Sequence, residues 1–331
     1  MPLSRPQKKV LFMAGLTRYV TRRGLQSIMI LWGISIMAFT IMHLAPGGPA
    51  AMLSQDPRVS PEVIKQINAS FGLDQPIPVQ YVKWVTSLLH GDFGRSFQDS
   101  RPVGEIVLER LPATITLNIT GLLLGLLGIP LGIYTALRRG SGFDHTVRIL
   151  TVLSNAAPDW WIGLLILVFV AAPTHLLPLG GMYTIGKEYD ILDRVWHLLL
   201  PTAISALGEW ILWSRFMRSG ILEVIQQDYI RTARAKGLRE SAVLNRHALR
   251  NALIPVVTIF SGSLAEIISG AVIFETVFSW PGIGRLAVTA LYARDYPVVM
   301  ALLMISSFLV LLGNLLADIA YTWVDPRVTL Q

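Results

Sequence analysis

The chain has 331 residues, of which 53% are hydrophobic and only 15% are charged. Soluble domains carry about 25% charged residues, so this composition excludes a water-soluble enzyme and favours a chain embedded in lipid. The chain has no cysteine, which excludes a disulfide framework, thiolate metal sites and cysteine catalysis. Its net charge of +7 is informative through its distribution along the chain.

Six long runs with few or no charged residues predict six transmembrane helices. A helix needs roughly 20 apolar residues to cross the hydrocarbon core, and each run is long enough. Because lipid offers no partner for bare backbone groups, such runs fold as helices. The predicted spans are residues 25–44, 111–137, 149–172, 196–213, 253–274 and 298–317. The predicted fold class is therefore an all-α integral membrane protein.

Lysine and arginine residues concentrate on one side of these spans. If the N-terminus is cytoplasmic, the segments on its side of the membrane hold 18 basic residues, and the segments on the other side hold 10. The cytoplasmic segments are then 1–24, 138–148, 214–252 and 318–331. An excess of basic residues marks the cytoplasmic side, so we expect both termini to be cytoplasmic.

The spans divide the chain into five parts. We expect a cytoplasmic N-terminal segment, a first transmembrane helix, an external loop or small domain, a core with five further transmembrane helices, and a cytoplasmic tail. Their predicted bounds are 1–24, 25–44, 45–110, 111–320 and 321–331. Within the core, the cytoplasmic segment 221–252 joins the fourth and fifth spans.

The second span carries four glycines on one helical stripe. Their spacing of four, three and four residues places them on one face. Small residues on such a face allow two helix backbones to approach closely within lipid. The stripe consists of Gly121, Gly125, Gly128 and Gly132. It is either a packing face within this helix bundle, which we favour, or a contact with another subunit.

The segment 221–252 predicts two amphipathic helices joined at a glycine. The apolar face of the first helix is formed by Leu222, Ile225, Tyr229 and Ala233. Gly237 can adopt a positive φ and end this helix, and a second run begins near Ser241. The physical pattern leaves two interpretations open. One is an elbow that enters the groove of a partner protein, and the other is a basic loop that lies on anionic lipid.

Three acidic residues lie inside predicted spans, where an unpaired charge costs several kcal/mol. They are Asp159, Glu209 and Glu266. One hypothesis is that they line a weakly acidic translocation path. The other is structural, with Glu209 paired to Arg215 or a neighbouring helix, and Glu266 bonded to serines such as Ser263. Asp159 follows Pro158, which predicts a local break in the third span.

The sequence contains no pattern typical of covalent chemistry or nucleotide binding. We find no nucleophile–base set and no cluster of metal ligands, so we expect no catalytic residue, metal site or bound cofactor. No feature indicates a nucleic-acid partner. Two classes of transport protein remain, one driven by a partner ATPase and one coupled to ions through the intramembrane carboxylates.

Several motifs together resemble one known family. The stretch Asp228–Gly237 is similar to the cytoplasmic signature loop of permease subunits of binding-protein-dependent ABC importers, in the dipeptide/oligopeptide/nickel subfamily. Further motifs resemble the first of that subfamily's two permeases and extend the likeness over nearly the whole chain. They are Phe71–Tyr81, Gly91–Ser96, Glu275–Arg285, Arg294–Pro297 and Asp325–Arg327.

This resemblance implies a fold, partners and site residues. It implies a multi-pass protein of a prokaryotic inner membrane that imports peptides, nickel chelates or oligosaccharides. The implied partners are a second homologous permease, two cytoplasmic ATPase subunits that bind ATP-Mg, and an extracytoplasmic substrate-binding protein. The implied ATPase-coupling residues are Asp228, Tyr229, Arg231, Thr232, Ala233, Arg234, Ala235, Lys236, Gly237 and Leu238.

The signature loop departs from the wider superfamily at two points, one of which is the later Leu-Pro, which falls at Leu249 and Arg250. That superfamily has Glu-Ala-Ala where this chain has Arg231, Thr232 and Ala233, so the glutamate is missing. The competing interpretation, an ion-coupled secondary transporter that uses Glu209 or Glu266, predicts uptake without an ATPase.

Overall fold

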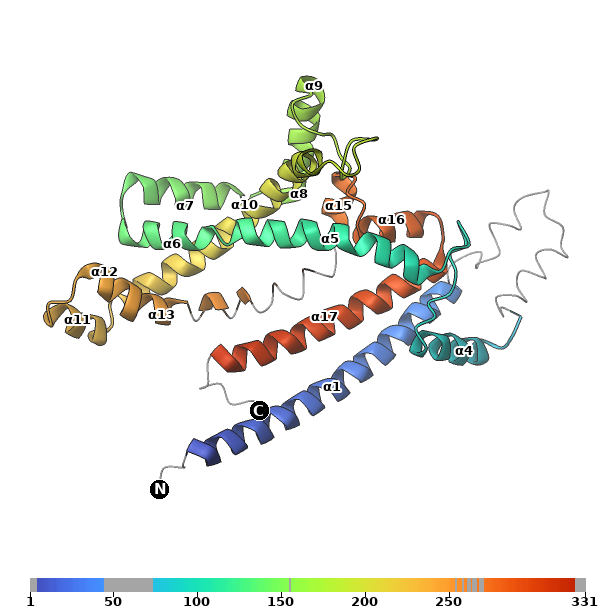
Figure 1. Ribbon diagram of the computed structural model, residues 1–331, viewed down its shortest axis with the longest axis horizontal. Coiled ribbons are helices and arrows are strands. Elements are labelled where there is room, and N and C mark those ends of the chain that lie inside the picture. The colour runs from blue at the N-terminus through green and yellow to red at the C-terminus, as the bar shows by residue number, and fades with distance from the viewer. Residues whose placement is uncertain are drawn as a thin grey trace.

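The structure is a computed structural model, and it describes residues 5–44, 74–154, 156–253, 255–257, 259–260, 263, 267 and 271–324. Within these residues the protein is all-helical, and the only strand-like feature is an isolated bridge between Arg95 and Pro102. The long helices run in roughly one direction, and the short helices gather at their ends (Figure 1). This arrangement agrees with the predicted fold class.

Helices α1 (Arg5–Leu44) and α17 (Tyr296–Val324) lie side by side (Figure 1). At one end, Tyr19 Oη donates a 2.7 Å hydrogen bond to Asp318 Oδ2, and Arg23 lies 3.3 Å from the same carboxylate. At the other end, α4 (Ile77–Leu89) is attached to α1. These polar contacts near both ends hold α1 against the rest of the chain.

The attachment of α4 uses two side-chain hydrogen bonds. Ser35 Oγ lies 2.8 Å from Tyr81 Oη, and His43 Nε2 lies 3.0 Å from Gln80 Oε1. Aromatic rings of both helices pack around these bonds, with Phe39 and Tyr81 centroids 5.3 Å apart. Amphipathic helices with such aromatic and polar side chains are typical of the membrane–water interface.

Helices α5 (Val103–Gly125) and α6 (Gly128–Leu137) form one interrupted span. Pro130 has no N–H group to donate to the carbonyl of Leu126, and its ring crowds that carbonyl. The carbonyl of Leu126 instead accepts a 3.0 Å bond from Ile129 N–H in a tighter turn. The span packs along α10 (Ile191–Val224), the longest helix in the core.

The third predicted span is broken. Helix α7 (Gly142–Ser154) lies beside α6, and the chain then bends by 90° before α8 (Asp159–Ile166). A π-helix η1 (Leu167–Ala171) and α9 (Ala172–Thr174) continue α8. Pro158 directly precedes α8, so the break predicted there is confirmed.

Four helices in the described residues are long and apolar enough to cross a membrane, and the bent α7–α8 pair makes a fifth candidate. The four spans are Arg18–Leu44, Val103–Leu137, Ile191–Val224 and Tyr296–Ile319. The predicted fifth span, 253–274, lies partly outside the described residues, and the 45–73 part of the external region lies wholly outside them.

The remaining helices lie at two opposite ends of the bundle. Helices α11 (Asp228–Ala235), α12 (Glu240–Ala242), a π-helix η2 (Val243–Ala248) and α13 (Leu249–Ala252) gather at one end (Figure 1). Helices α4 and α16 (Ile283–Tyr292), with α15 (Val272–Val277) nearby, lie toward the other end. The bundle thus presents two different faces, one at each end.

Candidate functional site

The predicted glycine elbow has a defined hydrogen-bond geometry. Gly237 has φ +75° and directly follows Lys236, the C-cap residue of α11. Gly237 N–H donates to the carbonyl of Arg234 at 2.9 Å, and Leu238 N–H donates to that of Ala233 at 3.4 Å. These two bonds form a Schellman motif, which closes a helix and needs a left-handed residue at the glycine position. The sequence therefore ends α11 at this point and turns the chain toward α12.

The elbow exposes most of the residues that the resemblance assigned to coupling. Ala233 is buried against Ile230, Val243 and Ala248, which together form a small core beneath α11. The other nine are exposed: Asp228, Tyr229, Arg231, Thr232, Arg234, Ala235, Lys236, Gly237 and Leu238. Such an exposed, largely polar surface on an apolar base is suited to a protein contact.

The apolar face expected for this segment is only partly right. Helix α10 ends at Val224, and α11 starts at Asp228 with a new direction, so one continuous face from Leu222 to Ala233 does not form. The buried residue of the first turn of α11 is Ile230, whereas Tyr229 is 42% exposed. The turn at 225–227 shifts the helical phase, and the periodicity alone did not reveal it.

An ion pair spans the elbow. Arg234 Nη2 lies 2.5 Å from Glu240 Oε1, and its Nε lies 3.1 Å from Oε2. The Arg234 guanidinium holds the pKa of Glu240 below its ordinary value, and the pair raises the pKa of Arg234. The pair joins the last turn of α11 to the first residue of α12, so it closes the elbow over Gly237.

Two further contacts connect the elbow to the long helices. Asn251 Nδ2 donates a 2.8 Å hydrogen bond to Tyr229 Oη, which links α13 to α11. Arg218, near the end of α10, forms a two-pronged ion pair with Asp144 of α7, with bonds of 2.8 and 3.0 Å. The first contact ties α11 to α13, which follows the elbow, and the second ties α10, which precedes the elbow, to α7.

The glycine stripe of α5 and α6 faces α10. A Cβ atom on Gly121 would lie 2.7 Å from Ser205 Oγ, and one on Gly128 would lie 2.9 Å from the Cα of Trp210. Gly125 and Gly132 similarly meet Glu209 and Ser214 of α10. Any side chain on these four residues would separate the two helices, which are in backbone contact within this chain.

The structure places two of the three intramembrane acids. Asp159 begins α8, and its carboxylate lies against Gly208 of α10. Glu209 packs against Gly125 and accepts a 2.7 Å hydrogen bond from Trp213 Nε1. Asp159 therefore reaches from α8 toward α10, whereas Glu209 belongs to α10 and faces α5. Glu266 lies outside the described residues.

Sequence reasoning missed a buried polar cluster around Glu275. This side chain is 0% exposed; its Oε1 accepts from Thr114 Oγ1 at 2.8 Å, and its Oε2 accepts from Arg285 N–H at 3.0 Å. Thr114 Oγ1 also accepts from Ile283 N–H at 2.8 Å. The cluster satisfies the free N–H groups at the start of α16, a position that favours a carboxylate. Burial raises the pKa of Glu275.

The two glycines of the same motif provide space for that carboxylate. A Cβ atom on Gly284 would lie 3.0 Å from Glu275 Oε2, and one on Gly282 would meet the same carboxyl group. Trp280 is buried beside them, and its Nε1 donates to the carbonyl of Ala113 at 2.8 Å. The two glycines that follow Glu275 by seven and nine residues are the signal in the sequence that could have indicated this close approach.

Two other motifs of the resemblance meet in space. Ser96 Oγ lies 2.5 Å from Asp295 Oδ2, and Phe97 N–H donates to Asp295 Oδ1 at 3.1 Å. Ser96 and Asp295 are both buried. The stretches Gly91–Ser96 and Arg294–Pro297 therefore act as one unit, which fixes the loop after α4 to the start of α17.

Metal chemistry has no support in the part of the chain that the structure describes, where no group of three His, Asp or Glu residues is arranged to hold an ion. We compared the chain with known proteins. A family model described as "Binding-protein-dependent transport system inner membrane component" matches residues 128–330, and the model of the N-terminal part of such components matches residues 16–118. The chain belongs to this family. It is a multi-pass component of an inner-membrane transport system and not an enzyme.

Individual relatives in this permease family are similar over most of their length. The oligopeptide transport system permease protein AppB of Bacillus subtilis is 43% identical over 94% of this chain and 98% of AppB. The dipeptide transport system permease protein DppB of Escherichia coli K12 is 35% identical over 89% of this chain and 94% of DppB. The probable D,D-dipeptide permease DdpB of the same strain is 38% identical over 91% and 94%.

A solved structure supports the fold. A chain of the MetNI methionine ABC transporter in an inward-facing form matches 66% of this chain and 96% of its own length, with a TM-score of 0.51 and 16% identity. This likeness shows that the permease family fold is present.

Proposed function

We propose that this chain is one of two permease subunits of an ATP-driven importer that carries peptides into the cytoplasm. The names of the relatives, which are oligopeptide, dipeptide and D,D-dipeptide permeases, support a peptide cargo. The observation that carries the proposal is the exposed elbow of α11, closed by Gly237, at one end of a helix bundle. An extracytoplasmic binding protein delivers the cargo at the opposite end.

The proposed topology has six spans with both termini in the cytoplasm. In Figure 1, the start of α1, the end of α17, the α6–α7 turn and α11 all lie at the same end of the bundle. These are the segments with the excess of basic residues, which supports their placement on the cytoplasmic side. Helices α4 and α16 are then external.

The elbow is the proposed contact with two cytoplasmic ATPase subunits, one for each permease. ATP-Mg binds to those subunits and not to this chain. The small core beneath α11 gives the elbow a firm base, and the Tyr229–Asn251 bond passes its displacement to α13. Arg231 stands in the place of the superfamily's glutamate, and in this chain the Arg234–Glu240 pair stabilises the elbow.

The intramembrane residues have two proposed roles. The glycine stripe keeps α5 and α6 in contact with α10, and Glu209, bonded to Trp213, stabilises that contact. Asp159 begins a helix after a 90° bend, where backbone can line a polar cavity, and we assign it to the translocation path. Replacing Asp159 by asparagine keeps the size of the side chain and removes its charge.

The proposed function is tested by purifying the chain from cells that express the neighbouring transport genes. We expect the chain to co-purify with a second permease and ATPase subunits, and to take up labelled peptide only with ATP and the binding protein present. Uptake that persists without ATPase subunits and stops when a proton gradient is removed would instead support the ion-coupled alternative.

A further inference from the structure

An apolar groove lies between α1, α4 and α17. It has a volume of about 650 Å³, and eleven residues line it. They are Ile28, Leu31, Trp32, Ser35, Val85, Leu88, Leu89, Phe93, Met304, Ile305 and Phe308. The hydroxyl group of Ser35 is already bonded to Tyr81 Oη and to the carbonyl of Trp32. Of the side chains that line the groove, only Trp32 still has an N–H group to donate, so an apolar chain fits the groove best.

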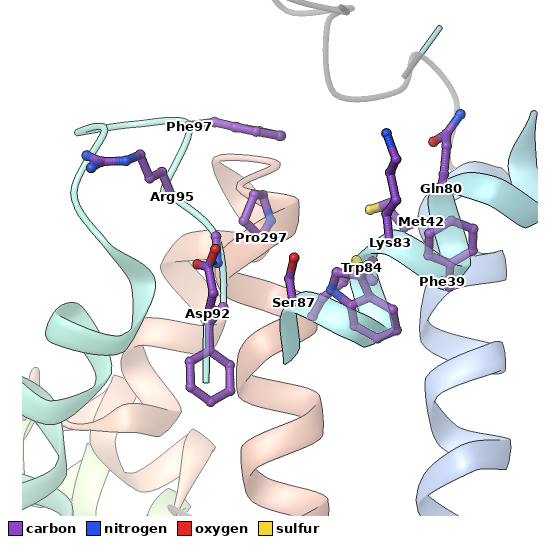
Figure 2. A pocket seen from close by; sticks show the side chains of 13 residues that line it. Phe39, Met42, Gln80, Lys83, Trp84, Ser87, Asp92, Arg95, Phe97 and Pro297 are labelled. Carbon is purple, nitrogen blue, oxygen red and sulfur yellow. The ribbon is translucent and has the colours of Figure 1, made fainter. Parts of the chain in front are cut away.

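A smaller, more polar cavity of about 240 Å³ lies next to this groove, and the two share Phe93. Figure 2 shows Lys83 and Asp92 on two sides of this cavity, with Ser87 between them and the ring of Trp84 below the Lys83 ammonium group. Lys83 makes no hydrogen bond or ion pair with any described residue, so its ammonium group is available. Arg95 also lines the cavity, and its Nη1 donates a 2.9 Å hydrogen bond to the carbonyl of Ser100. The cavity thus combines two cations, Lys83 and Arg95, which can both face a phosphate, with one anion, Asp92, beside aromatic rings.

The two cavities follow one another along α1, the helix that we propose as the first span. The groove begins near Ser35, which is nine residues or about 13 Å below the end of α1 at Leu44, and the polar cavity lies at that end. The groove is therefore at the depth of acyl chains in one leaflet, and the polar cavity is at the depth of head groups. In the proposed topology this is the outer leaflet.

We propose that these two cavities form a binding site for one phospholipid with an amine-bearing head group. An acyl chain fills the groove between α1 and α17. The phosphate pairs with Lys83, and the head-group ammonium pairs with Asp92. The charge pattern decides the occupant, because a zwitterionic head group satisfies both residues, whereas an anionic lipid without an amine leaves Asp92 repelled.

The chemistry of the groove also separates this lipid from other occupants. A peptide would bring backbone N–H and C=O groups into a groove whose lining offers them almost no hydrogen-bond partner, at a cost of several kcal/mol. An apolar helix of the second permease would fill the groove but would leave Lys83 and Asp92, whose Oδ1 accepts only the N–H of Gly94, without an ionic partner. The lipid satisfies the apolar groove and both charges together.

The test uses the purified full chain in its transport complex and two photoreactive lipids. Both carry a diazirine in one acyl chain; one has a phosphatidylethanolamine head group and the other a phosphatidylglycerol head group. We expect the first lipid to label groove residues such as Leu88 and Phe308, and to label them about tenfold more than the second. Asp92→Asn should abolish this preference, and Lys83→Ala should lower the labelling by both lipids.

A variant that fills the groove, together with its control, tests the acyl-chain part of the lipid site separately. Ile305→Trp should remove labelling, whereas Leu316→Trp, on an exposed part of the same helix, should not change it. The wild-type preference for one lipid is measured in the same experiment and does not depend on how the variants fold. Equal labelling by both lipids, unchanged labelling of Ile305→Trp, or capture of the second permease by a photoreactive residue at position 88 would overturn the proposal.

Discussion

Arg218 and Asp144 join the end of α10 to the start of α7 by an ion pair in which two nitrogens of Arg218 each contact one oxygen of Asp144. The Asp144 side chain is 1% exposed, and its Oδ2 also accepts the N–H of Gly140 at 3.1 Å. Arg218 lies six residues, or nearly two helical turns, before the end of α10 at Val224. The pair therefore fixes the frame from which the elbow projects.

Replacing Arg218 should destabilise this frame strongly. Arg218→Gln leaves the buried carboxylate of Asp144 without its partner, which typically costs about 3–5 kcal/mol in the free energy of unfolding. Asp144→Asn leaves no buried anion and should cost less. We expect this order in the midpoint of thermal unfolding of the purified chain, with Arg215→Gln as an exposed control on the same helix. Equal midpoints for Arg218→Gln and Arg215→Gln would show that the pair does not stabilise the frame.

A bulky residue at Gly237 should prevent ATPase association while the chain still inserts. Apart from the neighbours of Gly237, no atom of the described residues lies within 4 Å of a Cβ atom built on it, so the cost within this part of the chain is backbone strain of about 1–2 kcal/mol. Gly237→Leu therefore tests the space that a partner needs. Pull-down of the ATPase subunits measures the outcome.

The matched control is Gly186→Leu. Gly186 also has a positive φ, +87°, and open space around it, but it lies in the 173–190 loop at a distance from α11 in the sequence. The Gly186→Leu variant imposes the same kind of backbone strain but does not alter the elbow. If both variants lose the ATPase subunits to the same extent, strain and not docking explains the effect.

The Arg234–Glu240 pair should make the elbow insensitive to pH near neutrality. In the folded state the pKa of Glu240 is lowered. The stabilisation by Glu240 is therefore present above its ordinary pKa of 4.5 and is lost as the pH falls through the lowered pKa. Hydrogen exchange of residues 237–240, corrected for intrinsic rates, should show constant protection from about pH 5 to pH 8. A loss of protection within that range would contradict this assignment.

Removal of the pair should have a small effect, because both side chains are partly exposed. Glu240→Ala should lower the protection of the elbow at neutral pH by about 0.2–1 kcal/mol. Arg231→Ala is the control, since the Arg231–Asp228 contact of 3.5 Å is highly exposed and does not span the elbow. The double charge exchange of Arg234 and Glu240 should restore part of the protection.

The hydroxyl group of Thr114 should be essential for the buried polar cluster around Glu275. Thr114→Val keeps the shape but leaves Glu275 Oε1 and Ile283 N–H without this partner, which costs about 1–3 kcal/mol for each buried group. Thr116→Val, two residues away, removes only an exposed bond to the carbonyl of Pro112. Limited proteolysis of the 275–297 segment should distinguish the two variants, and identical cleavage rates would refute the role of Thr114.

The sequence predicted features that depend on local chemistry. Pro158 predicted a break because proline disrupts a helix wherever it lies in its interior, and the structure bends there by 90°. The helical end at Gly237 similarly follows from the φ that glycine allows. Helix length was less predictable: charged residues mark the end of the apolar run after Trp213, but α10 continues to Val224 because a helix does not stop at the membrane surface.

Long-range pairs could not be predicted from one sequence. Thr114 and Glu275 are 161 residues apart, and Asp144 and Arg218 are 74 apart. Each of these residues by itself resembles an ordinary loop or helix-end residue, and only the packing of α5 and α10 brings the partners together. The glycine stripe was different, because its spacing predicted close helix packing but did not identify α10 as the neighbouring helix.

The most direct test of the account is peptide uptake by vesicles that contain either the complete complex or this chain alone. The account predicts accumulation against a gradient only for the complete complex with ATP at the ATPase side, and none for the complex with Gly237→Leu. Accumulation by the isolated chain, or full uptake by the Gly237→Leu complex, would contradict the claim that the elbow receives its work from a partner ATPase.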